Sequence, residues 1–157
     1  MKIFLLTHER ELHRATNTGA LALESANEIV ERVLWERVNP NKDLTRLIEN
    51  NEAVLLYSKA KSSSAASRPR LTIEAYENII IIDGTWQESN KIFNQSSYLK
   101  NAAQFTLNTA NASLYKLRAN QPEGGLCTIE CIIEVLRLKG QHKMATELSL
   151  KFEQFNG

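Results

Sequence analysis

The chain has 157 residues, of which 43% are hydrophobic and 24% charged, as in an ordinary globular domain. Nineteen basic and eighteen acidic side chains leave a formal net charge of +1, which excludes a strongly basic nucleic-acid coat but not a local basic patch. The apolar start, residues 1–8, is too short for a signal peptide, and no window is long enough to span a membrane. Cys127 and Cys131 do not indicate a disulfide scaffold, so we expect a cytoplasmic protein.

Residues 2–6 predict a first buried strand, which leads into a polar segment over 7–19. A helix is predicted from about Ala20, with Thr18 as its N-cap. Its expected apolar face comprises five residues at helical spacing: Ala22, Ala26, Ile29, Val30 and Val33. Pro40 makes a longer helix unfavourable, because its ring breaks the helical hydrogen-bond pattern.

A short helix over 44–48 and a second strand over 53–57 are predicted next. The following stretch, 58–70, has the composition of a mobile cationic loop, with five serines and no acidic residue. Its four charges are Lys59, Lys61, Arg68 and Arg70.

The most informative segment is an apolar run that ends abruptly in the motif Asp83-Gly84-Thr85-Trp86. The run, 79–82, is β-branched throughout and does not alternate with polar residues, which is typical of a strand buried on both faces of a parallel sheet. Ligands of such sheets bind beyond the carboxyl ends of the strands, so Asp83 is the first candidate for chemistry. A helix over 86–94 is predicted to follow, with Trp86, Ile92 and Phe93 as candidate core anchors.

Short strands are predicted over 104–107 and 113–117, and a turn-forming cluster over 121–125. A helix over 128–139 precedes Gly140, a natural helix stop. The last helix carries a stripe that suits core packing: Met144, Leu148, Phe152 and Phe155. Strands that alternate with helices predict one α/β domain over 1–157, with a mainly parallel sheet flanked by helices.

Three blocks of the sequence, taken together and in order, resemble the DTW-domain family. The central block is the motif at 83–86, which matches that family's Asp-x-Thr-Trp directly. The first block is His8-Glu9-Arg10-Glu11 followed by Arg14 and Asn17-Thr18-Gly19, and the third is Tyr115-x-x-Arg118, Gln121-Pro122 and Gly125-Leu126-Cys127-Thr128-x-Glu130. The chain lacks the N-terminal cysteine cluster, suited to zinc, that many members carry, and we expect no metal.

The resemblance implies an S-adenosylmethionine-dependent transferase related to the knotted SPOUT RNA methyltransferases, with a C-terminal trefoil knot. Such an enzyme moves the 3-amino-3-carboxypropyl group onto the imino nitrogen of a uridine in tRNA and releases methylthioadenosine. Two alternatives stay open: a SPOUT-like RNA methyltransferase, and a non-catalytic RNA-binding or assembly protein that kept the fold.

Asp83 is our candidate general base, since a partly desolvated carboxylate can take the uridine imino proton. The alternative is that Asp83 caps the following helix. Thr85 is expected to orient Asp83 or bind the cofactor, or else to act as a second cap. Trp86 is expected to stack on a base or adenine, or else to anchor the core.

The cofactor candidates follow from backbone access and charge. Glycines let a backbone approach the adenine and ribose closely, an arginine matches a carboxylate, and a glutamate can hold an amino group or complement the helix dipole. The predicted cofactor residues are Gly84, Arg118, Gly124, Gly125, Leu126, Thr128 and Glu130.

Two groups are candidates for contact with the RNA substrate. Polar residues after the first strand share the expected ligand edge with Asp83: His8, Glu11, Arg14 and Asn17. The four cations of the 58–70 stretch, Lys59, Lys61, Arg68 and Arg70, suit phosphate contacts, although a solvated loop is an equal alternative. A net charge near zero means that tRNA is held by a local patch, by a homodimer that combines two patches, or weakly.

Overall fold

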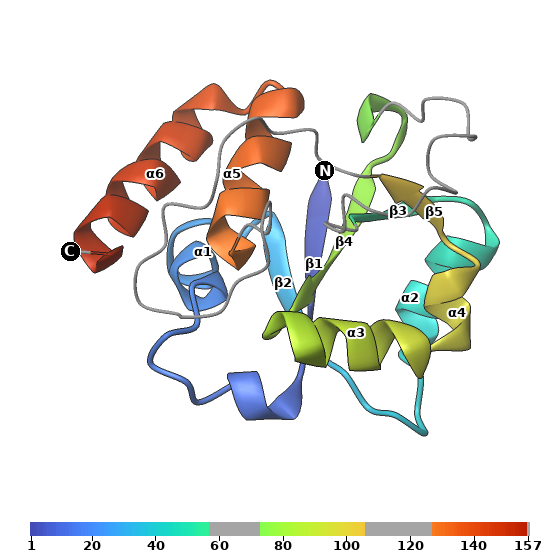
Figure 1. Cartoon of the computed structure of the whole chain (residues 1–157). Coiled ribbons are helices and arrows are strands. Elements are labelled where there is room, and N and C mark those ends of the chain that lie inside the picture. The colour runs from blue at the N-terminus through green and yellow to red at the C-terminus, as the bar shows by residue number, and fades with distance from the viewer. Residues whose placement is uncertain (57–72, 106–126, 157) are drawn as a thin grey trace.

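A sheet of five parallel strands in the order β2-β1-β4-β3-β5 forms the centre of the molecule (Figure 1). The computed structural model describes residues 1–56, 73–105 and 127–156. The strands are β1 (Lys2–Thr7), β2 (Val30–Leu34), β3 (Ala53–Leu56), β4 (Asn78–Asp83) and β5 (Ala103–Phe105). The predicted α/β class with a mainly parallel sheet is therefore confirmed.

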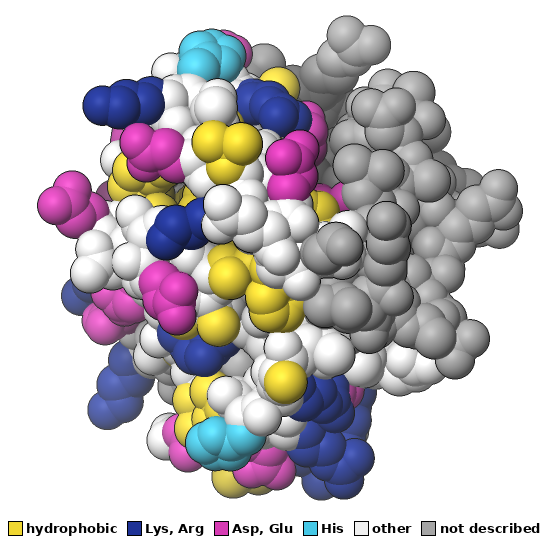
Figure 2. Space-filling view, turned by 90° about the vertical axis from the view of Figure 1, so that its left-hand side faces the viewer, with side chains coloured by type: hydrophobic (Ala, Val, Ile, Leu, Met, Phe, Trp, Pro, Cys, Tyr) yellow, Lys and Arg dark blue, Asp and Glu magenta, His cyan; other side chains and the backbone are white. Residues whose placement is uncertain are grey.

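Helices cover both faces of the sheet (Figure 1). On one face lie α1 (Gly19–Ser25), α5 (Thr128–Leu138) and α6 (His142–Asn156). On the other lie α2 (Lys42–Glu49), α3 (Trp86–Asn94) and α4 (Ser97–Lys100). Two short turns of 3-10 helix span Glu9–Glu11 and Ile73–Ala75. Figure 2 shows acidic and basic side chains interspersed on the side of α1 and α6.

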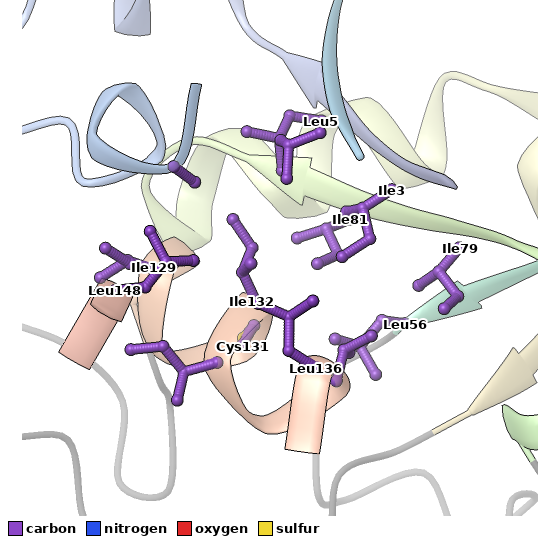
Figure 3. Packing of buried hydrophobic residues seen from close by; sticks show 14 of the residues in the cluster. Ile3, Leu5, Leu56, Ile79, Ile81, Ile129, Cys131, Ile132, Leu136 and Leu148 are labelled. Atoms are coloured by element: carbon purple, nitrogen blue, oxygen red, sulfur yellow. The ribbon is translucent and has the colours of Figure 1, made fainter. Parts of the chain in front are cut away.

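The two central strands, β1 and β4, supply side chains to both layers of the core. Their odd-numbered residues pack against α1, α5 and α6, as Ile3, Leu5, Ile79 and Ile81 do around Ile132 of α5 (Figure 3). Their even-numbered residues Phe4, Leu6 and Ile80 pack against the opposite helices. The continuous apolar run of β4 is explained by this burial on both faces, as the sequence predicted.

The helix predicted from Ala20 to residue 33 is wrong beyond residue 25. Helix α1 ends at Ser25, and Val30 and Val33 belong to β2, which pairs in parallel with β1. β-branched residues favour strands, and in β2 the segment 30–34 pairs with β1 and buries both valines. Val30 and Val33 are both buried in this short edge strand. A spacing of three between buried residues is therefore not specific to a helix.

Most of the other described elements agree closely with the prediction, although α4 was not predicted. Helix α3 has the predicted bounds, α5 ends one residue early, and Gly140 follows it with a φ of 79°, a left-handed conformation that suits glycine. The stripe of α6 packs into the core as predicted. The predicted loop over 58–70, the strand over 113–117 and the turn over 121–125 lie outside the described residues, and the C-terminal knot stays a prediction. None of the described helices combines the length and apolarity that a membrane span requires.

Candidate active site

The carboxyl ends of β1 and β4 lie side by side, because Thr7 and Asp83 are register partners. Leu34, at the end of β2, pairs with Thr7 on the other side. The polar segment over 8–19 starts from this edge, and so does the turn into α3. The predicted ligand edge therefore gathers residues that are far apart in the sequence.

Asp83 is the centre of a buried polar cluster and is only 1% exposed. Its Oδ1 accepts hydrogen bonds from Thr128 Oγ1 at 2.8 Å and from Asn17 Nδ2 at 3.0 Å. Its Oδ2 accepts from Thr7 Oγ1 at 3.2 Å, and Arg32 Nη2 lies 3.4 Å away. Burial raises the pKa of Asp83, while the hydrogen bonds from Thr128 and Asn17 act in the opposite direction. One carboxylate thus joins β1, β4, the 8–19 segment and the start of α5.

The Asn17-Thr18-Gly19 segment closes this cluster from one side. Asn17 Oδ1 accepts from Arg32 Nη2 at 2.8 Å and from the backbone N–H of Ala20 at 2.9 Å. A Cβ added to Gly19 would lie 3.0 Å from Asp83 Oδ2, so the close approach requires glycine here. Thr18 precedes α1 but does not cap it through its side chain; its hydroxyl accepts the N–H of Ile129 in α5 instead.

The cap of α3 is Thr85, not Asp83. Thr85 Oγ1 accepts the N–H of Glu88 at 3.2 Å, and Glu88 Oε1 accepts the N–H of Thr85 at 3.0 Å, which is a capping box. Asp83 lies two residues before the cap, and its side chain is occupied by the polar cluster. The capping alternative for Asp83 is therefore wrong, and the capping alternative for Thr85 is confirmed.

Trp86 does not anchor the core, since it is 40% exposed. Of the other two candidate anchors, Ile92 is fully buried, and Phe93 is half-buried against the same cluster. The first position of a helix projects from the sheet edge, which leaves the indole accessible beside the cluster.

A second polar network links the 8–19 segment to α3. Arg14 donates two hydrogen bonds of 2.7 Å to the two carboxylate oxygens of Glu88, and a further one to Glu11. Burial favours the neutral form of Glu88, but the Arg14 guanidinium and the Thr85 N–H outweigh it and lower the pKa of Glu88 to about 2. The carboxylate of Glu88 raises the pKa of Arg14 in turn. Glu11, fully buried, also accepts from Asn17 at 3.0 Å, so the two networks are continuous.

His8 is a buried part of the same scaffold. Its N–H donates to the carbonyl of Asp83 at 3.1 Å, and its Nδ1 accepts the N–H of Arg10 at 3.1 Å. Its ring is stacked on Trp35 with centroids 5.8 Å apart. The structure therefore brings the predicted RNA-contact residues His8, Glu11, Arg14 and Asn17 to the edge, but engages them in internal contacts.

Of the described residues predicted to bind the cofactor, Gly84 lies in the turn between β4 and α3, and the others stand at the start of α5. Thr128 is half-buried against Asp83, and Glu130 Oε1 accepts the N–H of Cys127 at 3.0 Å in the first helical turn. Cys127 and Cys131 are free thiols in the core cluster, as predicted, and burial raises the pKa of Cys131 to about 12. Within the three described ranges, no group of three or more His, Cys, Asp or Glu residues could hold a metal.

Several predicted site residues lie outside the described residues: Lys59, Lys61, Arg68, Arg70, Arg118, Gly124, Gly125 and Leu126. Sequence reasoning missed Thr7, Arg32 and Glu88. The spacing Thr85-x-x-Glu88 was a readable signal, because it is the capping-box pattern. Arg32 gave no signal of its own, since its strand was read as a helix.

Comparison with known proteins places this site in context. The family described as "DTW domain" matches residues 1–157. A relative from Drosophila melanogaster named tRNA-uridine aminocarboxypropyltransferase 2 is 28% identical over 146 residues, which cover 86% of this chain and 55% of the relative. One of the same name from Macaca fascicularis is 23% identical over 154 residues, which cover 95% of this chain and 51% of the relative.

The chain spans about half the length of these relatives. No solved structure matches it significantly. The family match over the whole chain agrees with the motif at 83–86 and with the polar cluster around it. The chain therefore belongs to the DTW-domain family.

Proposed function

We propose that this protein transfers the 3-amino-3-carboxypropyl group of S-adenosylmethionine to the imino nitrogen of a uridine in tRNA and releases methylthioadenosine. The names of the relatives and the family match support the reaction. The observation that carries the proposal is the buried cluster around Asp83 at the carboxyl edge of a parallel sheet, where such folds bind their ligands. The cytoplasmic location and the homodimer stay predictions.

The described side of the site fits S-adenosylmethionine, which supplies the transferred group when bound. Arg32 Nε is buried and has no acceptor within the described residues, although Nη2 of the same guanidinium contacts Asn17 and Asp83. The methionine carboxylate is the kind of acceptor that a guanidinium matches. Thr128 and Glu130 stand at the start of α5, directly after the glycine-rich segment that resembles the family's cofactor loop. We propose that these residues hold the ligand together with Gly84 and the 124–126 segment.

We propose that Asp83 has two roles, positioning and proton acceptance. Its oxygens are engaged by donors and it is 1% exposed, so a uridine imino N–H does not reach it directly. The half-buried hydroxyl of Thr128 lies 2.8 Å from Asp83 Oδ1. This hydroxyl can take the imino proton while it passes its own to Asp83, so that the proton reaches the carboxylate in one relay. We propose that the exposed face of the Trp86 indole stacks on the uridine or the adenine.

The reaction is tested by incubating the purified protein with S-adenosylmethionine and unmodified tRNA, followed by mass spectrometry of the nucleosides and the small-molecule product. We expect methylthioadenosine and an aminocarboxypropyl uridine in equal amounts. S-adenosylhomocysteine with a methylated nucleoside would instead identify a methyltransferase. Absence of S-adenosylmethionine binding in calorimetry would identify a non-catalytic protein and refute the proposal.

Substitution of Arg32 tests the carboxylate contact separately from the reaction. We expect Arg32→Gln to weaken binding of S-adenosylmethionine by about tenfold or more, since a charge-assisted hydrogen bond contributes roughly 1.5–3 kcal/mol. Methylthioadenosine lacks the carboxylate, so its affinity is expected to stay at the wild-type value. Calorimetry with both ligands checks this. Equal losses for both would assign Arg32 to the polar cluster alone.

A further inference from the structure

A second feature of the carboxyl edge is a groove of about 420 Å³ that the networks around Asp83 do not use. Three segments form it: the start of the polar segment (His8, Glu9, Arg10), the end of β2 and the residues after it (Leu34, Trp35, Glu36, Arg37), and α3 with the residue after it (Lys91, Gln95). Figure 1 shows these segments at the same end of the sheet, where the motif at 83–86 turns into α3. We name it the Arg37 groove.

The lining of the Arg37 groove includes the stacked rings of His8 and Trp35. Trp35 is buried, stacked on His8, and donates from Nε1 to Ser96 Oγ at 2.8 Å. Beside this ring pair lies Leu34, which is 45% exposed. Leu34 and the ring pair therefore give the groove an apolar part of its lining, of the kind on which a base or a ribose packs.

The rim of the groove carries three exposed cations, Arg10, Arg37 and Lys91. No acidic side chain of the described residues lies within ion-pair distance of these three, although other surface cations, such as Arg137, are paired with a neighbouring acid. Two acids also line the groove, of which Glu36 accepts a hydrogen bond from Asn39. Three positive charges against two negative ones favour an anionic ligand that reaches between the cations.

The groove is directly connected to the proposed reaction site. His8, in its lining, donates its backbone N–H to the carbonyl of Asp83 at 3.1 Å, and Lys91 belongs to the helix that Trp86 begins. The groove therefore borders the proposed reaction site, so a ligand chain bound at Asp83 can extend toward it.

We propose that the Arg37 groove binds a single-stranded nucleotide of the RNA substrate next to the target uridine. The phosphate lies among Arg10, Arg37 and Lys91, and the base or ribose packs against Leu34. This inference rests on the proposed function and adds to it that the uridine is read in an unpaired loop. Unstacked nucleotides, unlike those in an RNA duplex, can insert into such a groove.

The test compares two triple variants that remove the same charge. Arg10→Gln/Arg37→Gln/Lys91→Gln removes the groove cations, and Lys100→Gln/Lys143→Gln/Lys151→Gln removes three exposed cations outside it. Binding of unmodified tRNA, of a short single-stranded uridine-containing RNA and of a duplex RNA is measured by fluorescence anisotropy over a range of salt concentrations. Calorimetry with S-adenosylmethionine checks that both variants stay folded and keep the cofactor.

We expect the groove variant to bind tRNA and the single strand more weakly and with a salt slope smaller by about 0.7, the contribution of one single-stranded phosphate contact. The control variant should keep most of the affinity. Leu34→Asp should weaken the single strand further without affecting S-adenosylmethionine. If the groove variant kept the wild-type affinity and salt slope, or lost as much affinity for duplex RNA as for the single strand, the proposed nucleotide binding in the groove would be refuted. A wild-type protein that binds no RNA would overturn the proposed function as well.

Discussion

Asp83→Ala is expected to abolish formation of methylthioadenosine and to lower the free energy of unfolding by about 3–5 kcal/mol, the cost of leaving buried partners of a charged network unsatisfied. The structural reason is that Asn17, Thr7 and Thr128 all donate to this one carboxylate. The measurements are urea unfolding followed by tryptophan fluorescence and the product assay on the same preparation. A fully stable but inactive variant would restrict Asp83 to proton acceptance.

Asp83→Asn separates the two roles of the carboxylate more finely. The amide keeps the size of the side chain but replaces one accepting oxygen with a donor, which would face the donors Asn17 or Arg32. We expect intermediate stability and no activity above background. If the asparagine variant kept half or more of the wild-type rate, proton acceptance by Asp83 would be refuted.

The raised pKa of Asp83 gives this prediction a pH dependence. Because the native carboxyl binds its proton more tightly than the unfolded one, whose pKa is about 3.8, ionisation penalises the native state. The stabilisation that the protonated carboxyl of Asp83 gives the native state is lost as the pH rises from about 3.8 through the native pKa. Wild type should therefore lose stability relative to Asp83→Asn over this window. A constant difference between the two proteins would contradict the shift.

Thr128 supplies the control for the proton relay. Thr128→Ser keeps a hydroxyl near Asp83 Oδ1, while Thr128→Val removes it at nearly constant volume. We expect the serine variant to keep most of the activity and the valine variant to lose about 100-fold or more, the usual contribution of positioned proton transfer. Equal rates in the two variants would exclude the relay.

The sequence predicted the site best where the local residue pattern follows directly from the place of the segment in the fold. The run 79–82 is apolar throughout because β4 lies between β1 and β3 with helices on both faces. Its carboxyl end must then lie at the ligand edge, and Asp83 follows from this alone. Pairing with the polar 8–19 segment was expected for the same reason, since both segments follow parallel strands.

What the sequence could not predict depends on contacts between distant segments. Arg32 reaches Asp83 only because β2 pairs with β1, and five residues of an edge strand carry too short a pattern to be distinguished from a helix face. The internal engagement of Arg14 is another case. A half-exposed arginine in a polar segment looks like an RNA contact until the position of Glu88, 74 residues away, is known.

Removal of the Glu88 carboxylate is expected to have the second largest effect, because this group joins the 8–19 segment to α3. In Glu88→Gln, the Arg14 guanidinium loses the carboxylate that it binds with two hydrogen bonds. Arg14 is then held less firmly in its position beside the buried carboxylate of Glu11. We expect the free energy of unfolding at pH 7 to fall by about 1–3 kcal/mol, after allowance for solvent screening of a half-buried pair. Urea unfolding between pH 2 and pH 7 measures it.

The pH profile identifies the cause. The native pKa of Glu88, about 2, lies below its ordinary value of 4.5, so its stabilisation is complete above pH 4.5 and is lost as the pH falls toward 2. The difference in stability between wild type and Glu88→Gln should therefore shrink over this window. Glu134→Gln removes a surface partner of Arg137 and should change stability by less than about 1 kcal/mol at any pH. A wild-type–Glu88→Gln difference that stayed constant down to pH 2 would contradict a cause in the charge of Glu88. The capping box at Thr85 would not explain such a loss, because a neutral glutamine or a protonated glutamate can still accept that N–H.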